Sequence, residues 1–350
     1  MARREKNEKW KSFPISVKAN MFYLLYKNSV LSSVSLGRQI NILVGIKELY
    51  TIMSVIPSII NPYPTSYKHL RTRFEPQYGA LWCYFAPHPR PCFHFELLEE
   101  LRRFQEKISR PADDGERGGV RYVILASVTA GVFNFGGDLA LFIRCLKEND
   151  PDTLRRYAKD CIDVLYAHAT GFPPPITTIS LVQGDALGGG FEAALASDII
   201  VSEKQAQFGF PEVLFNLFPG MGAYNLLSRR IGMQQTERML LNGKLYRAEE
   251  LHAEGVVDIL SEDGRGENAV YEHIVRQAGR RNAQQAVLQI RRKLRPLLYE
   301  ELMEVKEIWV DTAMRLGPRE IRLMERIVNA QARVSSIAPA SIVPPRMGNA

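Results

Sequence analysis

The chain has 350 residues, and 46% of them are hydrophobic, so it can bury a sizeable core. One large domain with appendages is a better expectation for this length than several small domains. No apolar run reaches the roughly eighteen residues that a membrane-spanning helix needs. The N-terminal segment also lacks the clear apolar core and cleavage site of a signal peptide. These features predict a cytoplasmic protein with no membrane span.

The formal net charge is +7, which favours an acidic partner or substrate without identifying it. The four cysteines form no CxxC pair and no pattern with histidines that has metal-ligand spacing, so we expect no metal site, no disulfide framework and no cofactor. His168 is more typical of a satisfied helical residue than of a catalytic one. The densest basic segment contains Arg276, Arg280, Arg281, Arg291, Arg292, Lys293 and Arg295. This segment is either a solvated helix face or a surface for an acidic partner.

Along the chain, strand-like and helix-like segments alternate, and this alternation predicts an α/β core over residues 74–265. We interpret residues 1–73 as an N-terminal extension of unknown role. The expected strands of the core are 79–85, 121–126 and 177–182, and the expected helices are 96–108, 139–147 and 153–169. Further on, helical spacing runs to residue 295 and again from 302 to 334, which predicts a helical region over 266–338 before a loose tail at 339–350.

Three consecutive glycines, Gly188 to Gly190, lie between an expected strand and a segment rich in helix formers. Glu192 would lie in the first turn of that helix, where free N–H groups and the helix dipole can bind an oxygen that gains negative charge. A second turn, VFNFGGDL at 132–139, follows another strand-like run. We expect both turns to face one site, with an oxyanion hole formed by the backbone N–H groups of Phe135, Gly136 and Gly189.

These turns resemble those of the crotonase, or enoyl-CoA hydratase/isomerase, superfamily, from about residue 78 to residue 260. The landmarks follow the order of that family: QGDALGGGFE at 183–192, AQFGFPEV at 206–213, LLNGKLYRAEEL at 240–251 and GVVD at 255–258. The resemblance implies an α/β ClpP/crotonase-like fold, in which repeated ββα units form a spiral core followed by a C-terminal helical region. It also implies a homo-oligomer, either a trimer or a hexamer.

Within the superfamily, three segments are most similar to the bacterial diffusible signal factor synthases. They are residues 82–93, with WCY and RPCF, residues 132–142, with VFNFGGDLALF, and residues 307–316, with EIWVD and AMRL. The resemblance implies a bifunctional enzyme that dehydrates a 3-hydroxyacyl thioester of acyl carrier protein to the cis-2-enoyl form. The enzyme would then hydrolyse the thioester and release the free unsaturated acid as a signal. A sensor kinase is a possible further partner.

Two carboxylates accompany the glycine turn, Glu192 and Glu212, and we expect them to be the catalytic acid–base pair. Crotonases that add or remove water typically have two such residues, so the pair favours hydration or dehydration over isomerisation. Which glutamate is the base is left open. Asp138 is expected to cap a helix. The expected substrate contacts are Gly188, Leu139, Phe210, Leu214 and Trp309, although the sequence does not establish which of them line the pocket.

Three alternatives remain at this stage. The first is an enoyl-CoA hydratase of fatty acid metabolism. Residues 91–93 depart from the usual crotonase pattern, which argues against it. The second is a crotonase-fold regulatory binding protein without catalytic activity, which the retention of both glutamates disfavours. The third is an RNA-binding relative that uses the basic segment, and no nucleic-acid-binding motif supports it. Acyl-chain length, double-bond geometry and the choice between carrier protein and CoA are also open.

Overall fold

The structure is a computed structural model and describes residues 66–109, 119–172 and 176–334. The tail expected at 339–350 and most of the extension expected at 1–73 lie outside these ranges. The core sheet begins inside the expected extension, because its first strand, β1, spans Leu70–Glu75. In the part of the chain that the structure describes, no helix is long and apolar enough to cross a membrane.

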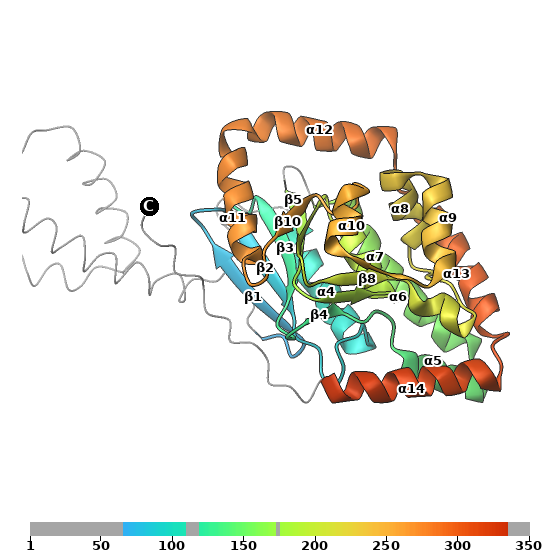
Figure 1. Cartoon of the computed structure of the whole chain (residues 1–350). Coiled ribbons are helices and arrows are strands. Elements are labelled where there is room, and N and C mark those ends of the chain that lie inside the picture. The colour runs from blue at the N-terminus through green and yellow to red at the C-terminus, as the bar shows by residue number, and fades with distance from the viewer. Residues whose placement is uncertain (1–65, 110–118, 173–175, 335–350) are drawn as a thin grey trace, which may run out of the picture. The chain divides into compact units, whose positions relative to one another are not determined.

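The main sheet has six strands in the order β1-β2-β3-β5-β7-β10 (Figure 1). β1 runs antiparallel to its neighbour β2, and all other neighbours are parallel. The strands after β1 are β2 (Ala80–Phe85), β3 (Tyr122–Ser127), β5 (Thr177–Val182), β7 (Ile199–Glu203) and β10 (Ile259–Ser261). β2, β3 and β5 have almost no exposed position, as is typical of parallel strands covered on both faces.

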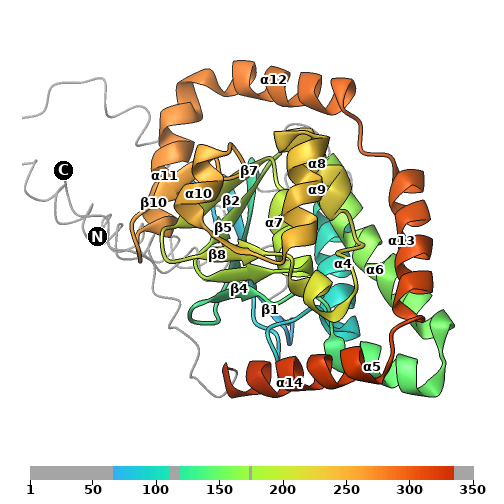
Figure 2. The same ribbon diagram turned by 45° about the vertical axis from the view of Figure 1, so that its right-hand side comes forward.

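Side chains from the two faces of this sheet enter two separate hydrophobic clusters. On β2, Leu81 and Phe85 belong to the larger cluster and Trp82 to the smaller one. The larger cluster includes residues of α4 (Phe95–Ser109), α5 (Leu139–Glu148) and α6 (Pro151–Thr170). α11 (Gly266–Gln277) covers the opposite face, and Figures 1 and 2 show it across the sheet from α4 and α6.

A second sheet of short strands connects the main sheet to the helices, in the order β4-β6-β8-β9. Its strands are β4 (Val132–Asn134), β6 (Asp185–Leu187), β8 (Gln207–Gly209) and β9 (Leu245–Arg247). β4, β6 and β8 each follow a long strand of the main sheet and precede α5, α7 (Gly189–Leu195) and the 3-10 helix η2 (Pro211–Phe215), respectively. The repeated strand–strand–helix order confirms the expected crotonase-like fold, and it brings the ends of three units together.

The remaining elements are mostly helical. After η2 come α8 (Ala223–Ile231), α9 (Met233–Asn242) and α10 (Ala248–Ala253), and after α11 come η3 (Ala278–Arg280), α12 (Arg281–Leu294), α13 (Tyr299–Ala313) and α14 (Pro318–Val334). α13 packs on α6, and α14 lies along α5 (Figure 2). The expected helix at 302–334 is two helices, because Pro318 has no N–H to donate within a helix and so begins α14.

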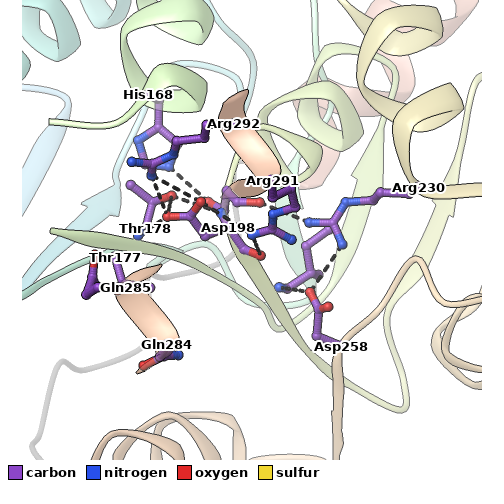
Figure 3. A network of polar contacts seen from close by, with 12 residues as sticks. His168, Thr177, Thr178, Asp198, Arg230, Asp258, Gln284, Gln285, Arg291 and Arg292 are labelled. Atoms are coloured by element: carbon purple, nitrogen blue, oxygen red, sulfur yellow. Dashed lines mark hydrogen bonds and ion pairs between the residues drawn. The ribbon is translucent and has the colours of Figure 1, made fainter. Parts of the chain in front are cut away.

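A network of ion pairs and hydrogen bonds around Asp198 fixes α12 to the core (Figure 3). The Asp198 carboxylate accepts a hydrogen bond from the N–H of Thr178 at 3.0 Å and pairs with Arg292 at 2.9 Å and Arg291 at 3.4 Å. Beside it, Arg230 pairs with Asp258 at 3.2 Å. Two of the arginines in the basic segment therefore pair with a buried carboxylate, which favours a structural role for this part of the segment.

Asp198→Asn is expected to lower the free energy of unfolding by roughly 2 kcal/mol, because it leaves two arginines beside a neutral amide in a mostly buried site. Urea unfolding followed by circular dichroism measures the change. Asp152→Asn is the matched control, since the side chain of Asp152 is 90% exposed and its pair with Arg155 is expected to contribute little. Equal stability of the two variants would contradict the structural role of Asp198.

Candidate active site

A cavity of about 340 Å³ lies where the three strand–strand–helix units meet. Its volume is within the range of about 300–1,000 Å³ that is typical of small-molecule sites. The wall is mostly apolar, with aromatic and aliphatic side chains from α4, α5, α6, α13 and α14, and it includes both Glu192 and Glu212. The cavity therefore combines an apolar space with two carboxyl groups.

The two glycine turns touch one another at the cavity. A Cβ atom added to Gly136 would lie 2.5 Å from the nitrogen of Gly189 and 2.7 Å from the oxygen of Leu187. One added to Gly189 would lie 3.5 Å from the nitrogen of Gly137. Gly136 also has a φ of +86°, which residues with a Cβ rarely adopt. Glycine is thus required at 136 both for backbone conformation and for the close approach of the turns.

The structure corrects two of the three expected oxyanion donors. The N–H of Phe135 donates to the carbonyl oxygen of Pro91 at 2.7 Å, and that of Gly136 donates to Oδ1 of Asn134 at 2.7 Å. The N–H groups of Gly137 and Gly189 donate to no acceptor among the residues that the structure describes, and both residues line the cavity. The two amides available to a ligand are therefore those of Gly137 and Gly189. The amide of Phe135 is not available because Pro91 lies beside the turn and accepts its hydrogen bond.

Side chains around this turn hold it in place. Asp138 caps α5, as expected, by accepting from the N–H groups of Ala140 and Leu141, and it pairs with Arg90 at 2.6 Å. The hydroxyl of Tyr157 donates to the carbonyl oxygen of Phe93 at 2.6 Å and accepts from the N–H of Asp138 at 3.1 Å. These hydrogen bonds hold the backbone on either side of Gly137 and leave its N–H group without an acceptor.

Glu192 lies in the first turn of α7 and is 2% exposed. Its Oε1 accepts hydrogen bonds from the N–H groups of Met221 and Ala223, both at 2.9 Å. Burial raises the pKa of Glu192 to about 7, although these backbone hydrogen bonds act in the opposite direction by stabilising the carboxylate. Glu192 is therefore a buried carboxyl that changes charge near neutral pH.

Glu212 lies in η2 and reaches back over the glycine turn. A Cβ atom added to Gly188 would be 2.2 Å from its Oε1, so only glycine leaves room for this carboxyl group. Its Oε2 is buried and has no hydrogen-bond partner among the described residues. Burial first, and then the charge of Glu192, raise the pKa of Glu212 to about 8. Because Glu192 has backbone donors and the higher pKa belongs to Glu212, the pair holds one proton near neutral pH, mainly on Glu212.

Of the expected substrate contacts, Leu139, Leu214 and Trp309 line the cavity, whereas Gly188 and Phe210 do not. Phe210 is fully buried, and its ring stacks on that of Phe191 with centroids 4.9 Å apart. Phe210 is therefore a core residue and not a substrate contact. Gly188 instead provides the space that Glu212 occupies.

Many cavity residues were not among the expected contacts, and α6 contributes several of them. Tyr157, Cys161, Leu165 and His168 line the cavity from this helix. Their spacings of four, four and three residues place them on one helical face. This periodicity was visible in the sequence, but it marks any buried helix face and does not identify a ligand. Ile327 and Gln331, four residues apart on α14, also line the cavity.

Comparisons with known proteins agree with this architecture. The family model described as enoyl-CoA hydratase/isomerase matches residues 112–312, which is more than half of the chain. A Mycobacterium avium protein named probable enoyl-CoA hydratase echA17 is 32% identical over 155 residues, or 44% of this chain and 57% of the relative. The chain thus spans little more than half the length of this curated relative.

Solved structures share the fold at low identity. Human mitochondrial delta3-delta2-enoyl-CoA isomerase has a TM-score of 0.62 at 20% identity, covering 75% of this chain and 98% of the isomerase. DspI of Pseudomonas aeruginosa has a TM-score of 0.55 at 21% identity, covering 75% of this chain and 97% of DspI. With the family model matching most of the α/β core, the chain belongs to the enoyl-CoA hydratase/isomerase family of the crotonase superfamily.

Proposed function

We propose that the protein dehydrates a 3-hydroxyacyl thioester to the cis-2-enoyl thioester and then hydrolyses that product to the free unsaturated acid. The observation that carries the proposal is the pair of buried carboxyl groups, Glu192 and Glu212, that share one proton beside the unengaged amides of Gly137 and Gly189. The carbonyl oxygen of a 3-hydroxyacyl thioester can accept hydrogen bonds from the two amides. Its C2 proton and its C3 hydroxyl can then react with the two carboxyl groups.

In the dehydration step, the ionised carboxyl takes the proton from C2, and negative charge moves to the thioester oxygen. The N–H groups of Gly137 and Gly189 stabilise that charge, and losing one such donor typically lowers kcat by about 10²–10³. The protonated carboxyl gives its proton to the hydroxyl at C3, so that the C3–O bond breaks and water leaves. General acid–base catalysis of this kind typically contributes about 10²–10⁴.

The hydrolysis step uses the same groups. A carboxylate removes a proton from water as the water oxygen adds to the thioester carbon, and the two amides stabilise the tetrahedral oxyanion. The C–S bond then breaks, the thiol leaves with a proton, and the acid is released. Neither step requires a metal or a cofactor.

We assign acyl carrier protein as the carrier on the resemblance of residues 82–93, 132–142 and 307–316 to the diffusible signal factor synthases. The net charge of +7 is compatible with an acidic carrier. The same resemblance supports a sensor kinase as a partner, and the wider resemblance to crotonases supports a trimer or hexamer. The competing candidate is hydration of a 2-enoyl-CoA, which is favoured by the 32% identity to a protein named as such a hydratase.

The test is to incubate the protein with 3-hydroxydodecanoyl carrier-protein thioester, or with the matching CoA ester, and to identify the released lipids by mass spectrometry. We expect free cis-2-enoic acid from the carrier-protein substrate, and none from the Glu192→Gln variant. Turnover of the CoA ester alone, without free acid, would replace the proposal with the hydratase. Full dehydratase activity in folded Glu192→Gln and Glu212→Gln variants would reject both roles of the carboxyl pair.

The rate of dehydration is expected to depend on pH as a bell, with a maximum near pH 7–8, because catalysis needs one ionised and one protonated carboxyl and the two pKa values lie at about 7 and 8. kcat/KM measured from pH 5 to pH 10 tests this. In the Glu212→Gln variant, the pH profile of the residual activity should lose the limb that reflects the ionisation of Glu212. A flat profile of the unaltered protein between pH 5 and pH 10 would contradict the shared proton.

A further inference from the structure

Besides the two glutamates, the amide or imidazole side chains of Gln105, His168 and Gln331 interrupt the apolar wall of the cavity. Gln105 of α4 is 6% exposed, and His168 of α6 is 3% exposed; both line the cavity. Their neighbours on the same two helices are apolar, among them Leu101, Phe104 and Leu165. Buried polar groups are costly unless they form hydrogen bonds, so their presence in this wall requires an explanation.

Each of the two side chains uses only part of its hydrogen-bonding capacity within the protein. Nε2 of Gln105 donates to the carbonyl oxygen of Val164 at 2.9 Å, and Nε2 of His168 bonds with Oγ of Ser197 at 2.9 Å. Oε1 of Gln105 and Nδ1 of His168 have no partner among the described residues. Val164 and His168 are one helical turn apart on α6, so the two unengaged atoms belong to neighbouring positions of the wall.

His168 contacts the chain just past the C-terminal end of α7, at Ser197, whereas the catalytic groups lie at the N-terminal end of that helix. Gly189, at the start of α7, offers its amide, Glu192 follows in the first turn, and Ala193 and Ala196 continue the cavity wall. Ser197, the partner of His168, comes next. With a rise of about 1.5 Å per residue, the path from Gly189 to Ala196 is roughly 10 Å long. A thioester bound at the Gly189 amide, with C2 and C3 at Glu192, would therefore send its acyl tail toward Gln105 and His168.

We propose that Gln105 and His168 form a polar end of the acyl cavity that binds a hydroxyl group near the tail of the acyl chain. A hydroxyl both donates and accepts, so it can donate to Oε1 of Gln105 and satisfy Nδ1 of His168 in either tautomer. Burial lowers the pKa of His168 to about 4, and a neutral imidazole leaves Nδ1 free to take either role. A fully apolar tail would leave both atoms without partners, which is how buried polar groups reject analogues that lack a hydroxyl. This inference rests on the proposed function, because it assumes an acyl thioester in the cavity.

The test compares matched pairs of 3-hydroxyacyl carrier-protein thioesters of several chain lengths, with and without a hydroxyl at the tail. Dehydration by the full-length protein, by Gln105→Leu and by Glu99→Gln is followed as kcat/KM. Glu99 lies on the solvent face of α4, so its variant is the control. At the length that reaches the pair, the unaltered protein should prefer the hydroxylated chain by about tenfold. Gln105→Leu should reduce that preference to about twofold or less, and Glu99→Gln should keep it.

The outcomes separate this inference from the proposed function. If the unaltered protein processes the plain chain at least as fast as the hydroxylated chain at every length, the polar end does not bind a substrate hydroxyl, and only this inference fails. A preference that persists in Gln105→Leu, but is lost in His168→Phe shown to be folded, would place recognition on His168 alone and overturn the role of Gln105. If neither kind of thioester is processed, the proposed function and this inference fail together.

Discussion

Glu212→Gln is expected to lower kcat for dehydration by about 10²–10⁴, because it removes a catalytic carboxyl and leaves the shape of the side chain almost unchanged. The same substitution should stabilise the protein at pH 8. The buried Oε2 of Glu212 has no partner among the described residues, so ionising it in the folded state is unfavourable. Glu192→Gln should lower activity similarly, with a smaller gain in stability, because Oε1 of Glu192 accepts two backbone hydrogen bonds.

The sign of the stability effect follows from the pKa of the folded state. The pKa of Glu212 is raised from 4.5 to about 8, so the stability that its protonated form contributes is fully present below about pH 4.5 and is lost as pH rises through 8. The amide introduced by Glu212→Gln cannot ionise, so the variant gains stability relative to the unaltered protein as pH rises, on the order of 4 kcal/mol at pH 8. Melting temperatures at pH 5 and pH 8, with Glu99→Gln as the control, measure the difference. An equal effect at both pH values would contradict a buried carboxyl that ionises unfavourably in the folded state.

Gly136→Ala is expected to lower kcat by about 10²–10³ or more, because it separates the two turns that carry the candidate oxyanion amides. The added Cβ would lie 2.5 Å from the nitrogen of Gly189, which is backbone and cannot rotate away, and the φ of +86° adds strain. Gly131→Ala is the matched control. Its φ of +69° is similarly unfavourable, but its Cβ would meet nothing within 4 Å.

The comparison of the two alanine variants isolates the effect of geometry at the site. Both should lose stability through backbone strain, by roughly 1 kcal/mol for Gly131→Ala and by more for Gly136→Ala. Only Gly136→Ala should lose activity when both are assayed well below their melting temperatures. Full activity of a folded Gly136→Ala variant would show that the contact between the turns is not needed for catalysis.

Local signals in the sequence sufficed to predict the placement of Glu192. Three glycines followed by helix formers specify a strand, a turn and a helix, and Glu192 indeed lies in the first turn of α7. The alternation of apolar strands with amphipathic helices likewise predicted the α/β core, and the resemblance of the motifs to those of crotonases implied its crotonase-like fold. These features depend on neighbouring residues, so a single sequence contains enough information for them.

Features that depend on distant segments could not be predicted in this way. The amide of Phe135 is occupied because residues 91–93, more than forty positions earlier, lie beside it, and no pattern within 132–139 shows this contact. Phe210 precedes Glu212 closely but is turned into the core against Phe191. The partners of Asp198 on α12 are more than ninety residues away. In each case, a contact with a segment distant in the sequence decides which partner the group has.

The most direct test of the account is a crystal structure of the Glu212→Gln variant with a bound 3-hydroxyacyl thioester. We expect the thioester oxygen within about 2.7–3.1 Å of the nitrogen atoms of both Gly137 and Gly189, with the hydroxyl at C3 between the carboxyl of Glu192 and the substituted amide. The acyl tail should run along α7 toward Gln105 and His168. A thioester oxygen distant from both amides, or an acyl chain outside the cavity, would contradict the assignment of this cavity as the site of thioester chemistry.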